Sequence, residues 1–136
     1  MPDLNDPEVV AEIARLHDAY ERALVANDVG ALTAFFWSSP QAVRFGASEQ
    51  SYGATEIAAF RNSHTPVFTD RRLRRREILA IGGDAASVMS EYTQKFEGRP
   101  RVVRQSQVWV RFPDVGWKIV SAHVSTLSSA RTCTAR

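Results

Sequence analysis

The sequence predicts an α+β domain in which a cone-shaped, curved antiparallel sheet wraps around a long N-terminal helix. Between Val9 and Leu24, apolar residues recur at steps of three and four, as on one face of a helix. From Arg72 onward they alternate at every second position, as in strands. Short turn segments separate the alternating stretches, which favours antiparallel neighbours. Helices that precede such a sheet cover one of its faces, so we expect a pocket at the open end of the cone.

The first helix is defined by its start and by its apolar face. Asp6 offers a capping side chain, and Pro7 suits the first helical position. We expect the helix to end near Asn27. One face of it carries apolar residues at helical spacing, namely Val9, Ile13, Leu16, Tyr20 and Leu24.

Two shorter helices and a short strand follow. Asp28 can cap a second helix, which Pro40 terminates. Residues 42–45 alternate as a strand, so Arg44 points away from the face of its two apolar neighbours. A third helix is predicted over 53–64, before a Thr-Pro pair that ends it.

The second half of the chain predicts a four-stranded meander. Gly, Pro and Asp dominate the connecting segments, as turns require. The strands are expected at 72–81, 86–96, 102–112 and 117–125. We predict one domain over residues 1–127 and a disordered polar tail over 128–136.

Composition excludes several classes of protein. A net charge of +2 is too small to indicate a nucleic-acid or membrane partner, and the arginine run at 71–76 is better explained as a solvated strand edge. The single Cys133 cannot form an internal disulfide, and no basic, apolar leader is present, so a cytoplasmic location is expected. The three histidines lack ligand spacing and no Gly-rich phosphate loop occurs, so we expect neither metal nor cofactor.

Tyr20 and Arg44 are the first candidates for a site. Burying an unpaired arginine is costly, so Arg44 needs a carboxylate partner. That partner is either a ligand, which makes Arg44 an anion clamp, or Glu49, which makes it a structural bridge. Tyr20 is either a core tyrosine or a donor of a hydrogen bond or a proton to a developing anion. Arg61 is interpreted as a helix-surface charge rather than a second carboxylate contact.

The third long strand offers a candidate wall for the pocket. Gln105, Gln107 and Trp109 share one of its faces. We favour this face because amides can bind the N–H and C=O groups of a urea, although a polar outer surface is the alternative. The opposite face would then expose Val102, Val108, Val110 and Phe112, which predicts a homodimer through the outer sheet face.

His123 is the first candidate for activating a water molecule, and Glu91 is the second. His123 shares a strand face with Ser125, which we include among the substrate-binding candidates. A histidine in a strand is also often only a hydrogen-bonded structural residue.

Three segments together resemble the nuclear-transport-factor-2-like superfamily, also called SnoaL-like, whose fold is cystatin-like. They are residues 20–28, 53–60 and 116–125. In ketosteroid isomerases of this superfamily, the position of Tyr20 holds an oxyanion-stabilising tyrosine and that of Arg44 holds the aspartate base. The resemblance thus implies that a base is replaced by a cation, which disfavours isomerase chemistry and favours an anionic substrate.

A narrower resemblance, to the AtzH-like group, rests on residues 36–46, 49, 52–53, 57–61 and 104–111. It implies a cofactor-independent decarboxylating amidohydrolase that acts on a small carboxylated urea, similar to 1,3-dicarboxyurea or oxalurate. Arg44 would hold a carboxylate, Tyr20 would supply a proton and His123 would act as the base. The alternative is a non-catalytic protein that binds a small anion or assists a ureide-degrading pathway.

Overall fold

The computed structural model describes residues 3–127 and confirms the predicted α+β fold. Three helices accompany six strands in one sheet of order β2-β1-β6-β5-β4-β3. The helices are α1 (Pro7–Ala26), α2 (Val29–Phe35) and α3 (Ala54–Ser63). The strands are β1 (Val43–Phe45), β2 (Gln50–Tyr52), β3 (Phe68–Ile81), β4 (Ala85–Phe96), β5 (Arg99–Phe112) and β6 (Gly116–Leu127). The predicted tail at 128–136 lies outside the described residues.

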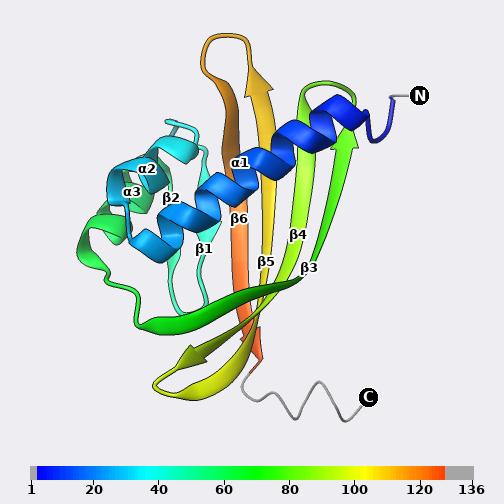
Figure 1. Ribbon diagram of the computed structural model, residues 1–136. Coiled ribbons are helices and arrows are strands. Elements are labelled where there is room, and N and C mark those ends of the chain that lie inside the picture. The colour runs from blue at the N-terminus through cyan, green and yellow to red at the C-terminus, as the bar shows by residue number, and fades with distance from the viewer. Residues whose placement is uncertain (1–2, 128–136) are drawn as a thin grey trace.

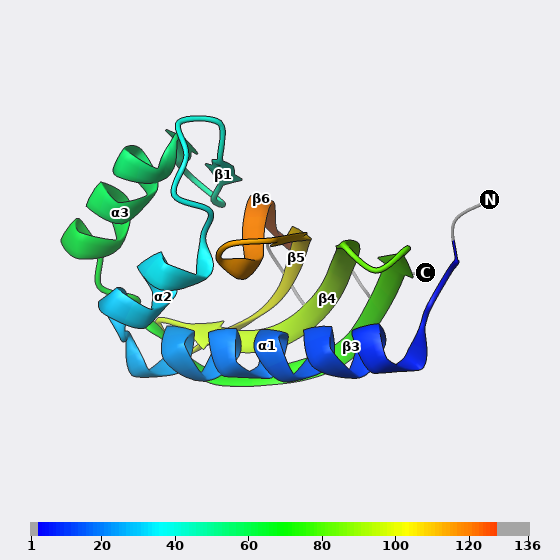
Figure 2. The ribbon, with the colours of Figure 1, turned by 90° about the horizontal axis from the view of Figure 1, so that it is seen from above.

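The four long strands curve around α1. Figure 1 shows α1 crossing the sheet diagonally, with α2 and α3 gathered beside the β1–β2 hairpin. Seen from above, α1 lies along the concave side of the sheet, and α3 stands apart from it at the side of β1 (Figure 2). The C-terminal half of α1 therefore lies on the same side of the molecule as α2 and α3.

The helix ends follow the capping rules. The Asp6 carboxylate accepts a hydrogen bond from the Glu8 amide (2.9 Å), and Asp28 accepts one from Ala31 (3.1 Å). Asn27 adopts a left-handed conformation (φ 51°) that ends α1. These predicted boundaries are confirmed.

The structure adds two features that the periodicity did not predict. β1 pairs with β2 as a hairpin but pairs in parallel with β6, far along the chain. β3 begins at Phe68 rather than at Arg72, because a bulge near Asp70 (φ 55°) lets the strand bend and continue. This bend carries the start of β3 toward α3.

The core lies between α1, α2 and the concave face of the sheet. Its largest fully buried side chain is Trp109, whose ring packs edge-on against Phe35 at 6.1 Å. Other fully buried members are Ile13, Leu32, Val88 and Ile119. This packing fixes α1 against the sheet and so positions Tyr20 at its far end.

The arginine run lies within edge strand β3. Arg71 points inward and its side chain is only 6% exposed, whereas the other arginines of the run pair with acids nearer the surface. The ion pairs are Arg72–Asp70 (2.9 Å), Arg74–Glu91 (3.1 Å), Arg75–Glu77 (3.0 Å) and Arg76–Asp18 (2.6 Å). Paired charges on an exposed edge fit a solvated strand that resists edge-to-edge aggregation. None of the helices within residues 3–127 has the length and apolarity to cross a bilayer.

Candidate functional site

A cavity of about 400 Å³ opens at the end of the cone. α1 supplies Tyr20, β1 supplies Arg44 and α3 supplies Arg61. The walls also include the start of β3, the hairpin end of β4 and β5, and the last residues of β6. Those elements contribute Phe68, Arg71, Gln94, Phe96, Arg101, Val103, Gln105, Val124 and Thr126.

Tyr20 and Arg61 form a buried pair in this cavity. They are 2% and 5% exposed, and Nη2 of Arg61 donates to the Tyr20 hydroxyl oxygen at 2.7 Å. A guanidinium has donors only, so the phenol accepts here and its own proton remains available to a ligand. Burial lowers the pKa of Arg61, but an arginine keeps its charge in proteins.

The prediction that Arg61 is a surface charge is therefore wrong. Ile57 and Arg61 are four residues apart on α3, so they share one helix face, and both are buried. The sequence signal was this spacing, because a large apolar residue such as Ile57 indicates the buried face of a helix. In the structure Ile57 is 1% exposed, and Arg61 lies on the same face.

Arg44 is buried and bound to Glu49. Its Nη1 donates to Oε1 of Glu49 at 2.7 Å, and its guanidinium lies 4.9 Å from the centre of the Phe60 ring. The structural bridge that the sequence left open is therefore present. The Glu49 side chain stays 26% exposed at the cavity wall, so this pair is open to exchange with a ligand.

The cavity carries more positive than negative charge. Arg71 is neutralised by Glu21 on α1 (2.8 Å), as Arg44 is by Glu49. Within the described residues, Arg61 and Arg101 have no carboxylate partner, and the Nε atom of each is buried without a hydrogen bond. An anion is therefore the ligand that suits this cavity.

The glutamine face of β5 points inward as predicted, but only part of it lines the cavity. Gln105 does so, and its amide nitrogen donates to Glu21 (3.3 Å). Gln107 and Trp109 instead lie in the core, where the indole N–H donates to Oε1 of Gln107 at 3.0 Å. The predicted role of these two as a ligand-binding wall is not supported, because the cone is already filled at their level.

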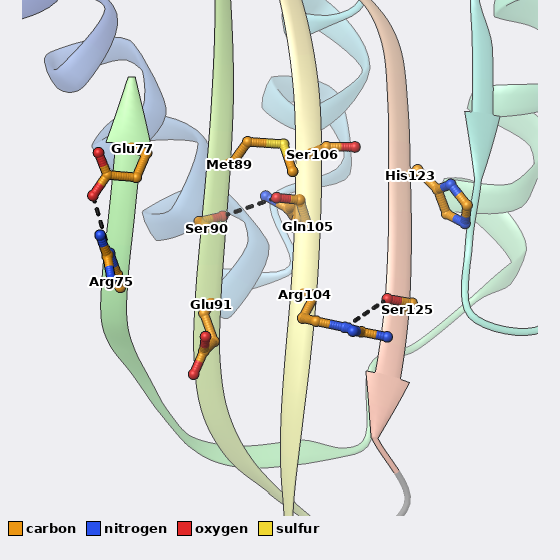
Figure 3. Close-up of a pocket in the computed structure, with 10 residues that line it drawn as sticks. All are labelled: Arg75, Glu77, Met89, Ser90, Glu91, Arg104, Gln105, Ser106, His123 and Ser125. Atoms are coloured by element: carbon orange, nitrogen blue, oxygen red, sulfur yellow. Dashed lines mark hydrogen bonds and ion pairs between the residues drawn. The ribbon is translucent and has the colours of Figure 1, made fainter. Parts of the chain in front are cut away.

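His123, Glu91 and Ser125 lie on the opposite face of the sheet. There they line a shallow groove of about 380 Å³, in which Arg104 donates to Ser125 (Figure 3). The register sets this placement, because β5–β6 pairing joins Ser106 to His123, on the face away from Gln105. The structure does not bring His123 to Tyr20 and Arg44, so it cannot be the base of the cavity.

The histidine that does line the cavity is His64. Its ring stacks on Phe60 at 4.7 Å and it is exposed. No group of three or more His, Cys, Asp or Glu side chains in the described part of the chain is arranged to hold a metal ion.

The outer sheet face is less apolar than predicted. Val108 is 39% exposed, as expected, but Val102 is only 3% exposed, and Phe112 stacks on Trp37 at 5.1 Å. Met89 adds an exposed apolar side chain that the strand pattern did not single out.

A buried histidine on α1 joins the helix to the sheet. His17 is fully buried, with Nδ1 3.2 Å from Nη1 of Arg76 and Nε2 3.3 Å from the Tyr92 hydroxyl. Arginine can only donate, so Nδ1 must accept, and the neutral ring carries its proton on Nε2. Protonation of Nδ1 would place its N–H against the N–H donor of Arg76, and the hydrogen bond between the two residues would be lost.

Burial lowers the pKa of His17, and the nearby Arg76 and Arg71 lower it further, although Glu21 and Asp18 oppose them. Its folded pKa is thus below its unfolded value. The contribution of neutral His17 to the stability of the fold is therefore fully present above about pH 6.5, its unfolded pKa. This contribution is lost as the pH falls below that value toward the folded pKa.

We expect the melting temperature to fall on acidification from about pH 8 to about pH 5, and His17→Gln to reduce this dependence because it removes the titrating ring. The matched control is His123→Gln, which removes an exposed histidine. Thermal unfolding across this range checks the expectation. An equally steep decline in His17→Gln and in the unmodified protein would contradict it.

The comparisons with known proteins agree with this fold. The AtzH-like family model matches residues 2–130. A crystal structure of a protein of unknown function from Pectobacterium atrosepticum shares 40% identity, with a TM-score of 0.85, over 93% of this chain and 96% of that one. A cystatin-like fold protein from Burkholderia xenovorans shares 40% identity, with a TM-score of 0.86, over 93% and 98% of the two chains.

More distant structures extend the likeness to the fold alone. The CaMKII hub of S. rosetta is 22% identical, with a TM-score of 0.67, over 88% of this chain and 95% of that one. No curated protein matches the chain. The family match spans nearly all of the sequence, including every wall of the cavity, and so the chain belongs to the AtzH-like family.

Proposed function

We propose that the chain is a cofactor-independent decarboxylating amidohydrolase acting on a small carboxylated urea, with 1,3-dicarboxyurea as the first candidate and oxalurate as the second. The observation that carries the proposal is the buried Tyr20–Arg61 pair, which leaves the phenol proton available inside a cationic cavity. The family to which the chain belongs supports the choice of substrate.

Loss of carbon dioxide from an N-carboxylated urea requires a proton donor. The bond between the carboxylate carbon and nitrogen breaks, the electron pair stays on nitrogen and spreads into the urea carbonyl, and one proton must be added. Tyr20 supplies that proton or a hydrogen bond to the developing anion, and takes a proton back from water. Arg61 stabilises the negative charge that the phenol oxygen gains. No base is needed for this step, in accord with the distant place of His123.

The neutralised Arg44 suits the carboxylate that leaves. This group becomes uncharged as carbon dioxide forms, so a strong ion pair would stabilise the substrate more than the transition state. Arg44 already shares its charge with Glu49 and can orient the carboxylate without holding it tightly.

A direct assay tests the proposal. Purified protein is incubated with 1,3-dicarboxyurea, carboxybiuret and oxalurate, and release of carbon dioxide and ammonium is followed. We expect turnover of at least one compound, with 1,3-dicarboxyurea giving carbon dioxide and a monocarboxylated urea. If correctly folded protein turns over none of them, the proposal fails.

The Arg44–Glu49 pair also favours a second candidate function, a protein that binds a small anion without reaction. Glutarate is a suitable unreactive probe, because its two carboxyl carbons are separated by three atoms, as in 1,3-dicarboxyurea. Both functions predict that Glu49→Gln tightens binding of glutarate by about tenfold, since Arg44 loses its competing acid. In an enzyme the same change lowers the turnover number, because the substrate carboxylate is then held more strongly.

Titration calorimetry with glutarate measures this effect. Glu91→Gln is the matched control, as it removes a carboxylate from the outer face. Gly46→Ala is a second test, because a Cβ at this position would overlap the Glu49 carboxylate and displace it. Unchanged or weaker affinity in both Glu49→Gln and Gly46→Ala would contradict the prediction.

We further propose a homodimer through the outer sheet face. This face combines exposed Met89 and Val108 with the acid Glu91 and the base Arg104, so one copy can complement another about a two-fold axis. A monomeric mass by light scattering at micromolar concentration would contradict it.

A further inference from the structure

We propose that Arg101 forms a second anion subsite, which binds the carboxylate that the substrate retains and selects dianions over monoanions. The inference rests on the proposed function for the identity of the natural ligand, but the subsite itself is argued from the geometry of β4 and β5.

Arg101 lies on the inner face of the sheet, away from Arg44. The β4–β5 register places it opposite Gln94, whose side chain accepts from Arg71 on the helix-facing side (2.7 Å). Through β6, Arg44 lies level with Gln107, several residues further along β5. The two guanidinium groups therefore approach the cavity from different ends.

The Arg101 guanidinium is held but not neutralised. It lies over the Phe96 ring, 5.1 Å from the ring centre, and its Nε is buried without a hydrogen bond. Within residues 3–127 no carboxylate pairs with it, and the sequence from 128 to 136 contains no Asp or Glu. An aromatic platform fixes the plane of the fork and leaves its edge free to bind both oxygens of a carboxylate.

The other three arginines of the cavity have other partners. Arg44 has Glu49, Arg71 has Glu21, and Arg61 contacts the Tyr20 hydroxyl. Arg61 and Arg101 thus leave two positive charges in the cavity without an internal acid. A dianion matches this charge, with its reacting end beside Tyr20 and its retained carboxylate on Arg101.

Comparing the affinities of glutarate and its monoamide distinguishes a cavity with one anion subsite from a cavity with two. Glutarate has three atoms between its carboxyl carbons, as 1,3-dicarboxyurea does, and the monoamide replaces one carboxylate with a neutral group of the same shape. We expect the unmodified protein to bind glutarate about tenfold more tightly than the monoamide in titration calorimetry. Arg101→Gln should reduce this preference to less than about twofold, because only one anion subsite then remains for either probe.

Two variants control for charge and for folding. Arg104→Gln removes the same charge from the same strand, but on the outer face, and should keep the full preference. Arg101→Lys keeps the charge but lacks the planar fork, so it should keep only part of the preference for glutarate. Melting temperatures show that each variant is folded.

Equal affinities for the two probes in the unmodified protein, no binding of glutarate, or a preference that survives in Arg101→Gln would overturn the subsite. Turnover is measured separately. A protein that prefers glutarate through Arg101 but converts no ureide would refute the proposed reaction and leave the subsite intact.

Discussion

Tyr20→Phe is expected to lower turnover of 1,3-dicarboxyurea by about a hundredfold to ten-thousandfold, the range typical for loss of a positioned proton donor. The substitution removes one oxygen atom and keeps the ring, which packs edge-on against Phe35 at 5.6 Å and Phe36 at 6.5 Å. The shape of the cavity is therefore retained. Steady-state rates of carbon dioxide release measure the effect.

The same change leaves Nη2 of Arg61 without its acceptor. Because this group is buried, we expect a stability loss of about 1–3 kcal/mol. Glutarate should still bind, since the arginines remain. Loss of turnover with retained binding thus separates a reacting hydroxyl from a residue that only holds the fold.

Tyr92→Phe is the matched control. Tyr92 is also a buried tyrosine that packs beneath α1, but its hydroxyl contacts His17 outside the cavity. We expect it to affect stability and not turnover. Equal loss of turnover in both variants, or full activity of Tyr20→Phe, would contradict a catalytic role for Tyr20.

The sequence was sufficient to predict the fold class because its strongest signals are local. Helix caps at Asp6 and Asp28, the spacing along α1 and the alternation from Arg72 depend only on near neighbours. The parallel pairing of β1 with β6 depends on packing between distant segments, and no local pattern encodes it.

The site was predicted only in part, for the same reason. Tyr20 and Gln105 line the cavity as expected, because the apolar period of α1 identifies its buried face and Gln105 shares a strand face with the large apolar Trp109. His123 was misplaced, since a strand's alternation shows which residues share a face but not which face is inside. The partner of Arg44 stayed open, because the turn at Gly46 that brings Glu49 back onto β1 has no signal in the strand pattern.

Trp109 shows the consequence of choosing the right face but the wrong depth. It is 0% exposed and packs on Phe35, so Trp109→Ala should destabilise the protein by about 3–5 kcal/mol, as large-to-small core substitutions do. The indole also donates to Oε1 of Gln107, whose amide nitrogen is buried without any hydrogen-bond partner among the described residues. Removing the indole therefore leaves a whole buried amide unpaired, which adds to the loss.

Urea unfolding distinguishes this role from a ligand-binding wall. Trp37→Ala is the control, because Trp37 stacks on Phe112 at the margin of the core and is partly exposed, so its removal should cost less. Trp109→Phe should recover much of the packing but not the hydrogen bond. If Trp109→Ala instead folded with nearly full stability and lost glutarate binding, the cavity would have to extend inward to Trp109, and the charges at its mouth would no longer define the ligand.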